Sequence, residues 1–335
     1  MRVSVAVPCR DGSDPVGLAA LVRSLASQTC PPHQIIVSVD GDQRPLDADA
    51  LFPALVIRGR KVGPGGTRNR AIAAATGDLL LFLNDDVVPE PDLIERHIVA
   101  AREARDRPAM VLGLARWAVR QPDLLIDRVL RESSLVFFYD RMSNAPRDHD
   151  WGPRHAWTLN LSLPRSICEP FSERLAYPMF DDIEWATRVT GRYGAPVLYR
   201  PEAVVTHHHW YRPIELARRE VMLGHQAWRL ADINHALAAS MFGGRFVPDL
   251  LADRCAELGA DLSPAIEAFR VFCETASKPA QRFTPDQVGS IVASIESWRT
   301  TARTWGFVRA AKGSLCEEAM DGFCDRFRLR TETAA

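Results

Sequence analysis

An excess of charge of one sign is missing from this sequence. Its 335 residues carry 41 Lys and Arg against 42 Asp and Glu, a formal net charge of −1. A nucleic-acid-binding protein needs a concentrated excess of basic residues to neutralise phosphates, so we expect no nucleic acid as a partner. With 47% hydrophobic residues, the composition is that of a globular chain long enough for one large domain and an appendage.

Long apolar runs and paired cysteines are missing too. No segment approaches the roughly 18 apolar residues of a membrane span, and the start, MRVSVAVPCRDG, is too weakly apolar for a signal peptide. The seven cysteines are odd in number, widely spaced and without a CxxC pair, a pattern typical of free thiols in a reducing cytosol. We therefore expect a cytoplasmic protein. A peripheral contact of its helical tail with the inner face of the membrane stays open.

Strand-like segments alternate with amphipathic ones along the first half of the chain. This alternation predicts right-handed crossovers, and hence an α/β fold with a mainly parallel sheet. The predicted strands cover 3–7, 34–40, 54–59, 79–83 and 110–117, and the predicted helices cover 15–28, 65–77 and a segment after Pro91. Gly77 is expected to close the second helix.

The sequence pattern of the second half changes twice, from a polar loop to strands around a helix and then to helices alone. The polar, aperiodic stretch 140–155 predicts a mobile loop that closes over a ligand. Strand patterns return at 156–164 and 195–209, around a helix at 181–194. Beyond residue 213 the pattern is helical, with breaks near Gly243 and near Pro279.

An acidic pair follows the most apolar strand. In LLLFLNDDVVPEPDL (79–93), five apolar residues run directly into Asp85 and Asp86. Such a run is typical of a strand buried on both faces, and ligands bind at the carboxyl ends of strands in open α/β sheets. The two aspartates either form a turn or hold Mg²⁺ or Mn²⁺ on a diphosphate.

Other polar residues stand at neighbouring strand ends. Asp40 and Asp42 follow the second strand and could accept hydrogen bonds from a base or a ribose. Arg68, in the first turn of a helix in GPGGTRNRA, could contact the ligand, by binding phosphate or lying against a base, although an exposed helix arginine is the commoner case. In the run THHH, His207 and His209 occupy alternate strand positions, so both could face one ion, although a solvated patch is the commoner case.

Five segments in this order resemble the family 2 glycosyltransferases, which invert the anomeric centre and have the GT-A fold. They are VSVAVPCRDG, QIIVSVDGD, GPGGTRNRAIAAATGDLLLFLNDDVVPEPDLIERH, FDDIEWATRV and AVVTHHH. The resemblance covers roughly residues 1–225 and implies a GT-A domain there, a mainly parallel mixed sheet flanked by helices. Residues 226–335 then form a helical C-terminal region of unknown role.

The resemblance implies roles for single residues. Those expected to bind the donor nucleotide are Pro8, Arg10, Asp40, Arg68 and Asp85, with Asp40 at the base and Asp85 near the ribose. The resemblance places Asp86 and His207 at the metal. His209 is added because it lies on the same face of the strand as His207. Asp182 stands where the family keeps its catalytic base, but Asp181 replaces a more usual Glu and Trp185 a more usual Leu, so the base stays open between Asp181 and Asp182. Their alternative role is to cap the helix that they begin.

The implied activity is transfer of a sugar, hexosyl or related, from a nucleoside-diphosphate donor to an acceptor hydroxyl. A UDP-sugar is favoured as donor, a divalent metal (Mn²⁺ or Mg²⁺) is the cofactor, and the acceptor is a glycan, lipid-linked, peptide or small molecule. Trp157 and Trp185 are weak candidates for acceptor contacts, since a Trp is more often in the core.

Three alternatives stay open. An inactive nucleotide-binding relative could bind a partner through its C-terminal helices. A sugar nucleotidyltransferase would share the fold, but its glycine-rich signature follows the first strand, whereas GGTR comes later here. A glycoside hydrolase would use two carboxylates and leave Arg68 and the metal residues unexplained.

Overall fold

The computed structural model describes residues 1–41, 47, 49–104, 107–142 and 144–327, so the predicted site residue Asp42 lies outside the described residues. The contacts divide the chain into two units. The sheet unit comprises Met1–Ala118 and Phe138–His209, and the helical unit comprises Val119–Phe137 and Trp210–Ala335. A functional boundary at residue 225, implied by the resemblance, stays a prediction.

One mixed sheet of eight strands organises the sheet unit. The strands are β1 (Val3–Arg10), β2 (Gln34–Asp40), β3 (Leu55–Gly59), β4 (Leu79–Leu83), β5 (Val87–Pro89), β6 (Met110–Trp117), β7 (Asn160–Pro164) and β8 (Val197–His207). Their order is β3-β2-β1-β4-β7-β6-β8-β5. The first four are parallel to one another, while β7 is antiparallel to both β4 and β6.

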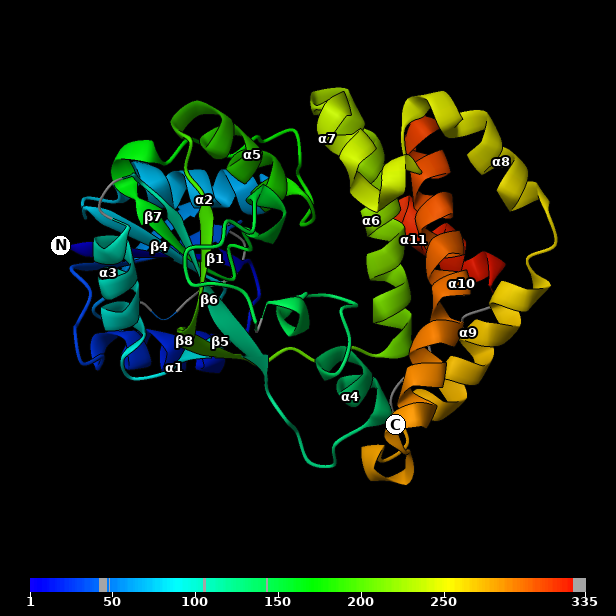
Figure 1. Cartoon of the computed structure of the whole chain (residues 1–335), viewed down its shortest axis with the longest axis horizontal. Coiled ribbons are helices and arrows are strands. Elements are labelled where there is room, and N and C mark those ends of the chain that lie inside the picture. Colours follow the sequence, from blue (N-terminus) through cyan, green and yellow to red (C-terminus); the bar gives the residue numbers. More distant parts are fainter. Residues whose placement is uncertain (42–46, 48, 105–106, 143, 328–335) are drawn as a thin grey trace. The chain divides into compact units, whose positions relative to one another are not determined.

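Helices cover both faces of this sheet. Figure 1 shows α2 (Gly63–Ala74) and α5 (Asp181–Tyr193) over one face and α1 (Pro15–Ala26) and α3 (Leu93–Glu103) over the other. Right-handed crossovers explain this arrangement, because the chain moves outward from β1 to β2 and back across the sheet from β3 to β4. The central strand β4 is therefore buried at all five positions, as its apolar run predicts.

Gly77 does not close α2 as predicted. The helix ends at Ala74, and Gly77 lies three residues further along, against the start of β1. A Cβ at Gly77 would lie 2.6 Å from the Ser4 backbone nitrogen, so close packing rather than helix termination explains this glycine.

β6 and β8 bend together. Their parallel pairing shifts at one point: Gly113 pairs with Arg200, but Leu114 pairs with Val204. Residues 201–203 of β8 therefore bulge out, and a bulge bends its strand and increases its twist. Beyond the bend, β8 pairs antiparallel with β5, a short strand that the sequence did not reveal.

The buried residue Asn160 on β7 stabilises this bend by hydrogen bonds. Its side-chain amide donates to the carbonyl oxygens of Leu114 (3.2 Å) and Ala203 (2.9 Å), which lie on the two bent strands. Only glycine fits at position 113, because a Cβ there would lie 2.2 Å from Asn160 Nδ2.

His97 of α3 completes the network. Its Nε2 lies 2.9 Å from Asn160 Oδ1 and its Nδ1 lies 2.8 Å from Ser162 Oγ. Since the Asn160 amide donates its own hydrogens elsewhere, Oδ1 accepts, so Nε2 carries the proton and Ser162 donates to Nδ1. Burial lowers the pKa of His97 to about 4, and the ring is therefore neutral at physiological pH.

The segment predicted as a mobile loop has a defined path in its described part, 140–142 and 144–155. It contains the 3₁₀ helices η1 (Tyr139–Arg141) and η2 (Pro153–His155). Asp150 Oδ1 accepts hydrogen bonds from the backbone nitrogens of Gly152 and Val197, each 2.9 Å away. The segment is thereby tied to the start of β8, and its closure over a ligand stays a prediction.

The helical unit is built around two long helices, α6 (Pro213–Ile233) and α10 (Pro285–Ala311), which lie side by side (Figure 1). Their backbones touch at two glycines: a Cβ at Gly224 would lie 1.8 Å from Arg303 O, and one at Gly306 would lie 1.9 Å from Val221 O. The remaining α-helices of this unit in the described residues are α4 (Leu125–Arg131), α7 (His235–Ser240), α8 (Leu251–Gly259), α9 (Ser263–Ala276) and α11 (Cys316–Arg326). The helical pattern and its two breaks are confirmed.

A buried charge cluster joins α6 to α10. Glu220 has no exposed surface and forms ion pairs with Arg219 (3.0 Å), Arg299 (3.3 Å) and Arg303 (2.5 Å). Burial acts to raise the pKa of Glu220, but the three guanidinium groups outweigh it and hold the pKa below its ordinary value. Removing one partner of such a cluster leaves an uncompensated buried charge, which is strongly destabilising.

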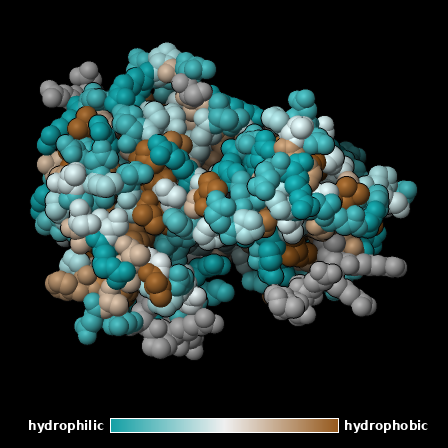
Figure 2. Space-filling view, turned by 90° about the horizontal axis from the view of Figure 1, so that it is seen from below, coloured by the Kyte–Doolittle hydropathy of each residue, from teal (hydrophilic) through white to brown (hydrophobic). Residues whose placement is uncertain are grey.

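Hydrophobic residues on the face in Figure 2 lie in small groups among hydrophilic ones. Within the described part of the chain, none of the helices is both long and apolar enough to cross a bilayer. The peripheral membrane contact considered from the sequence stays a prediction.

Candidate metal and catalytic site

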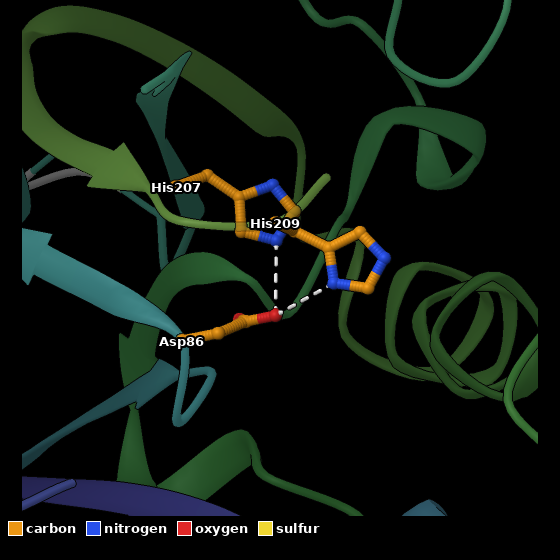
Figure 3. A group of neighbouring side chains, drawn as sticks. All are labelled: Asp86, His207 and His209. Carbon is orange, nitrogen blue, oxygen red and sulfur yellow. Dashed lines mark hydrogen bonds and ion pairs between the residues drawn. The ribbon is translucent and has the colours of Figure 1, made fainter. Parts of the chain in front are cut away.

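Asp86, His207 and His209 meet at one point. Asp86 Oδ2 lies 3.3 Å from His207 Nε2 and 3.3 Å from His209 Nδ1 (Figure 3). Three potential ligand atoms, one from each side chain, lie within 4.8 Å of one another. Carboxylate oxygen and imidazole nitrogen together are a donor set that suits Mn²⁺, Zn²⁺ or Fe²⁺.

The pairing of β5 with β8 creates this cluster. Val87 lies opposite His207, so the residue before Val87 faces the end of β8, and the His208 backbone nitrogen donates to Asp86 O at 2.8 Å. The Trp117 ring packs against the His207 ring at a centroid distance of 4.8 Å and restricts its orientation. The short strand after the acidic pair thus explains why apolar residues resume at Val87.

The geometry fits a cation. Asp86 Oδ1 is buried and has no hydrogen-bond partner in the described structure, so one carboxylate oxygen is available to a ligand. Burial acts to raise the pKa of Asp86, but hydrogen bonds from His207 and His209 outweigh it and lower the pKa well below its ordinary value. Asp86 is therefore ionised, as a metal ligand must be.

Asp85 faces the loop after β1. Its Oδ2 accepts a hydrogen bond of 2.5 Å from Ser13 Oγ, and the same hydroxyl accepts from the Arg10 backbone nitrogen at 3.1 Å. Burial raises the pKa of Asp85, and the charge of Asp86 adds to the rise. Pro8, also predicted for the nucleotide, is half-buried two residues before the exposed Arg10.

Asp40 holds the start of α2. Its two oxygens accept hydrogen bonds from the backbone nitrogens of Val62 (2.7 Å) and Gly63 (3.0 Å), and Arg70 lies 3.6 Å away. Asp40 pairs in register with Arg10 across β1 and β2, so both predicted nucleotide residues lie at the same sheet edge. The structure thus gives Asp40 a supporting role in the fold, and its contact with a base stays a prediction.

Arg68 is buried and bound to Asp181. Its Nη1 lies 2.9 Å from Asp181 Oδ2, and its guanidinium lies 5.6 Å from the centroid of the Phe171 ring. Its Nη2 lies 3.5 Å from Asn84 Oδ1, in the turn that carries the acidic pair. Of the two alternatives left by the sequence, the exposed helix arginine is wrong: only 6% of this residue is exposed.

Asp182 differs from its neighbour. It is half-buried, its Oδ1 accepts from the Ile183 backbone nitrogen at 2.8 Å, and it makes no ion pair with Arg68. Burial raises the pKa of Asp182 to about 7, and the negative charge of Asp181 adds to this, while the positive charge of Arg68 and the backbone of Ile183 oppose it. A carboxylate with a pKa near neutrality is suited to accept a proton.

Backbone strain precedes this pair. Met179 and Phe180 have φ of 116° and 63°, a region that side chains other than glycine rarely adopt. The Met179 backbone nitrogen donates to Asp181 Oδ1 at 3.2 Å, which helps to hold the strained turn. Strained backbone of this kind is concentrated at functional sites.

The two tryptophans predicted near the acceptor have different surroundings. Trp185 is fully buried, its ring stacked on Phe171 at 4.7 Å and its Nε1 donating to Glu169 O at 2.6 Å. The acceptor contact predicted for Trp185 is wrong, because the ring has no surface to offer. Trp157 is 6% exposed, and the backbone of the next residue, Thr158, acts to lower the pKa of Asp182, so Trp157 lies in the neighbourhood of the candidate base.

Several site residues escaped the sequence analysis. Ser13 could have been noticed as a hydroxyl in the loop after the first strand. Asn160 carried no local signal, since its contacts with the bend depend on the fold. Trp117 was considered from the sequence as a tryptophan that could stack on a sugar, and its contact with His207 was not foreseen.

Comparisons with known proteins agree with this picture. Residues 4–148 match the family model described as "Glycosyl transferase family 2". Over 132 residues the chain is 26% identical to the glucosyl-dolichyl phosphate glucuronosyltransferase of Haloferax volcanii, a match that covers 37% of this chain and 42% of that protein. The chain therefore spans less than half of the length of this curated relative.

Two solved structures are similar to the whole chain. The mannosyltransferase PcManGT from Pyrobaculum calidifontis, in complex with GDP-Man and Mn²⁺, is 16% identical, with a TM-score of 0.50 over 94% of this chain and 88% of that one. S. aureus TarS is 15% identical, with a TM-score of 0.46 over 91% of this chain and 55% of that one. The likeness to the mannosyltransferase confirms the predicted fold class, the GT-A fold with helices after it.

Proposed function

We propose that this chain, whose residues 4–148 match the model of glycosyl transferase family 2, moves a sugar from a nucleoside-diphosphate donor to an acceptor hydroxyl. The reaction forms a bond from the acceptor oxygen to the anomeric carbon and breaks the bond from that carbon to the diphosphate. The acceptor proton must leave and the diphosphate must gain negative charge. The sheet unit contains a candidate group to accept the proton and candidate groups to stabilise the negative charge.

The donor lies at the carboxyl edge of β1, β2 and β4 in this proposal. Asp40 faces the base, Asp85 the ribose, and Arg10 and Pro8 border the nucleotide. Arg68 contributes positive charge beneath the acidic turn through its proximity to Asn84. UDP is our first choice of nucleotide.

The divalent cation is held by Asp86, His207 and His209. When bound, it neutralises charge that develops on the departing diphosphate. The Asp86 carboxylate is the observation that carries the proposal: its Oδ2 lies 3.3 Å from one ring nitrogen of each imidazole, and its buried Oδ1 has no partner among the described residues.

Asp182 takes the proton of the acceptor hydroxyl. Asp181 is committed to Arg68, so Asp182 is the carboxylate of the pair that is available to a substrate. Asp181 and Arg68 position it, because their ion pair holds the Asp181 carboxyl next to Asp182, where its negative charge adds to the rise that burial causes in the pKa of Asp182. An acceptor held by Asp182 attacks from the face opposite the diphosphate and inverts the anomeric centre.

The test is a panel of nucleotide sugars. The purified chain is incubated with UDP- and GDP-sugars and Mn²⁺, with candidate acceptors and with water alone, and released nucleoside diphosphate is measured. We expect release from at least one donor, its loss in EDTA, and its loss in Asp182→Asn with unchanged nucleotide affinity. Nucleotide binding without any release from the whole panel would favour the inactive nucleotide-binding alternative.

A further inference from the structure

Aromatic rings gather beside the candidate base. The aromatic cluster consists of Phe138, Trp151, His155 and Trp157. The His155 ring lies 5.4 Å from that of Trp151, 5.6 Å from that of Trp157 and 6.2 Å from that of Phe138. Phe138, Trp151 and His155 are only half-buried, so the cluster offers ring surface to a ligand.

Two arginines lie over the same ring of this cluster. The guanidinium of Arg141 lies 5.5 Å from the centroid of Phe138, and that of Arg154 lies 5.9 Å from it. Both residues are exposed, and neither forms an ion pair or a side-chain hydrogen bond within the described residues. Two uncompensated positive charges on one ring repel each other and create a local positive potential that an anion would relieve.

His155 adds a neutral acceptor atom. Its Nδ1 lies 2.7 Å from Trp151 O, and a carbonyl oxygen only accepts, so Nδ1 carries the proton. Nε2 then holds a lone pair that can accept a hydrogen bond from a hydroxyl. Burial lowers the pKa of His155, the hydrogen bond to the Trp151 carbonyl opposes this, and the positive charges of Arg154 and Arg141 lower the pKa further, so the ring stays neutral at physiological pH.

The cluster adjoins the candidate base. The short helix η2, which carries Arg154 and His155, packs against α5, the helix that begins with Asp181 and Asp182. The Trp151 backbone nitrogen also donates to Val197 O at 2.9 Å. These contacts preorganise the cluster on the side of Asp182.

We propose that the aromatic cluster with Arg141 and Arg154 is an acceptor subsite, and that the acceptor is a hydroxyl compound carrying an anionic group, phosphate or carboxylate. This inference rests on the proposed function. The acceptor packs against the exposed rings, its anionic group binds the two guanidiniums, and a hydroxyl donates to His155 Nε2. Arginine forms strong, charge-assisted bonds with both phosphate and carboxylate.

The test measures binding by calorimetry on the full chain with Mn²⁺. UDP and GDP are titrated first, which tests the donor site by itself, and the better one is then kept saturating. Glucose 6-phosphate, glucuronate, inorganic phosphate and glucose are then titrated. The phosphate and carboxylate arms distinguish the two sources of negative charge, and glucose supplies the uncharged reference.

The variants are Arg141→Gln and Arg154→Gln, with Arg23→Gln as the matched control, an exposed arginine of α1 that likewise has no ion pair. We expect at least one anionic probe to bind more tightly than glucose, each cluster variant to weaken it about tenfold, and Arg23→Gln to leave it unchanged. Because inorganic phosphate can also bind Mn²⁺, only the arginine-dependent part of the affinity counts.

Anion affinity that is the same in all three variants, or no anion binding at all, would overturn the subsite. The donor titration separates this failure from that of the proposed function. If neither UDP nor GDP binds while arginine-dependent anion binding persists, the proposed function fails and the anion site remains.

Discussion

Replacing Asn160 by alanine should loosen the bend that brings His207 to Asp86. The change leaves the buried carbonyls of Leu114 and Ala203 without their donor and His97 Nε2 without its acceptor. Each buried polar group left unpaired costs about 1–3 kcal/mol. We therefore expect the free energy of unfolding to fall by at least about 3 kcal/mol.

Asn160→Ala should also weaken metal binding, although Asn160 is not one of the three residues of the candidate metal site. Loss of the supports around metal ligands typically weakens metal binding about 10- to 100-fold, and we expect about tenfold weaker Mn²⁺ binding here. Ser162→Ala is the matched control: it removes one hydrogen bond to the same His97 but none to the bend, so it should cost about 1–2 kcal/mol and leave Mn²⁺ affinity unchanged.

Urea denaturation gives the free energy of unfolding, and calorimetric titration of the folded protein gives the Mn²⁺ affinity. If both variants lowered Mn²⁺ affinity equally, general loss of stability would explain the effect and the bend would have no special role. Unchanged Mn²⁺ affinity in a destabilised Asn160→Ala would refute the reasoning directly.

Other changes test other parts of the account. Asp182→Asn should lower turnover at least about a hundredfold with nucleotide affinity nearly unchanged; if Asp181→Asn lost activity instead, the two roles would have to be exchanged. Since the base must be ionised and its pKa is raised to about 7, kcat/KM should rise with pH through about 7 and level off above it, and a flat profile from pH 5 to 9 would contradict this. In the helical unit, Gly306→Ala should lower the free energy of unfolding by about 1–3 kcal/mol, because the added Cβ would meet Val221 O. Gly289→Ala on the same helix should be neutral or stabilising, because nothing lies within 4 Å of the added Cβ. Equal effects of the two variants on thermal unfolding would show that α6 and α10 do not pack through the Gly306 contact.

Local patterns were enough for the strands that organise the sheet. β1, β2 and β4 were predicted because their apolar residues are contiguous and turn residues follow them, and this placed Asp40, Asp85 and Asp86 at one edge. The alternation of His207 and His209 left two alternatives, a solvated patch or two rings that could face one ion, and in the structure both rings contact Asp86.

Features that depend on tertiary contacts were missed. β5 has only three residues, too few for a period to show, and it exists because β8 bends toward it. Trp185 was misjudged because its stacking on Phe171, which lies outside α5, is a tertiary contact that no helical period shows. The ion pair of Arg68 with Asp181 joins helices more than a hundred residues apart, so no local pattern could show it.

The central claim is that a divalent cation held by Asp86 and the two histidines binds the diphosphate of the donor. Calorimetric titration of UDP and GDP, with Mn²⁺ and with EDTA, tests it on the wild type, on Asp86→Asn and on Asp92→Asn, the aspartate just before α3 that forms an ion pair with Arg96. We predict that Mn²⁺ strengthens nucleotide binding at least about tenfold in the wild type and in Asp92→Asn, and that Asp86→Asn abolishes this gain. Equal nucleotide affinity with Mn²⁺ and with EDTA, or a gain that survives in Asp86→Asn, would contradict the account.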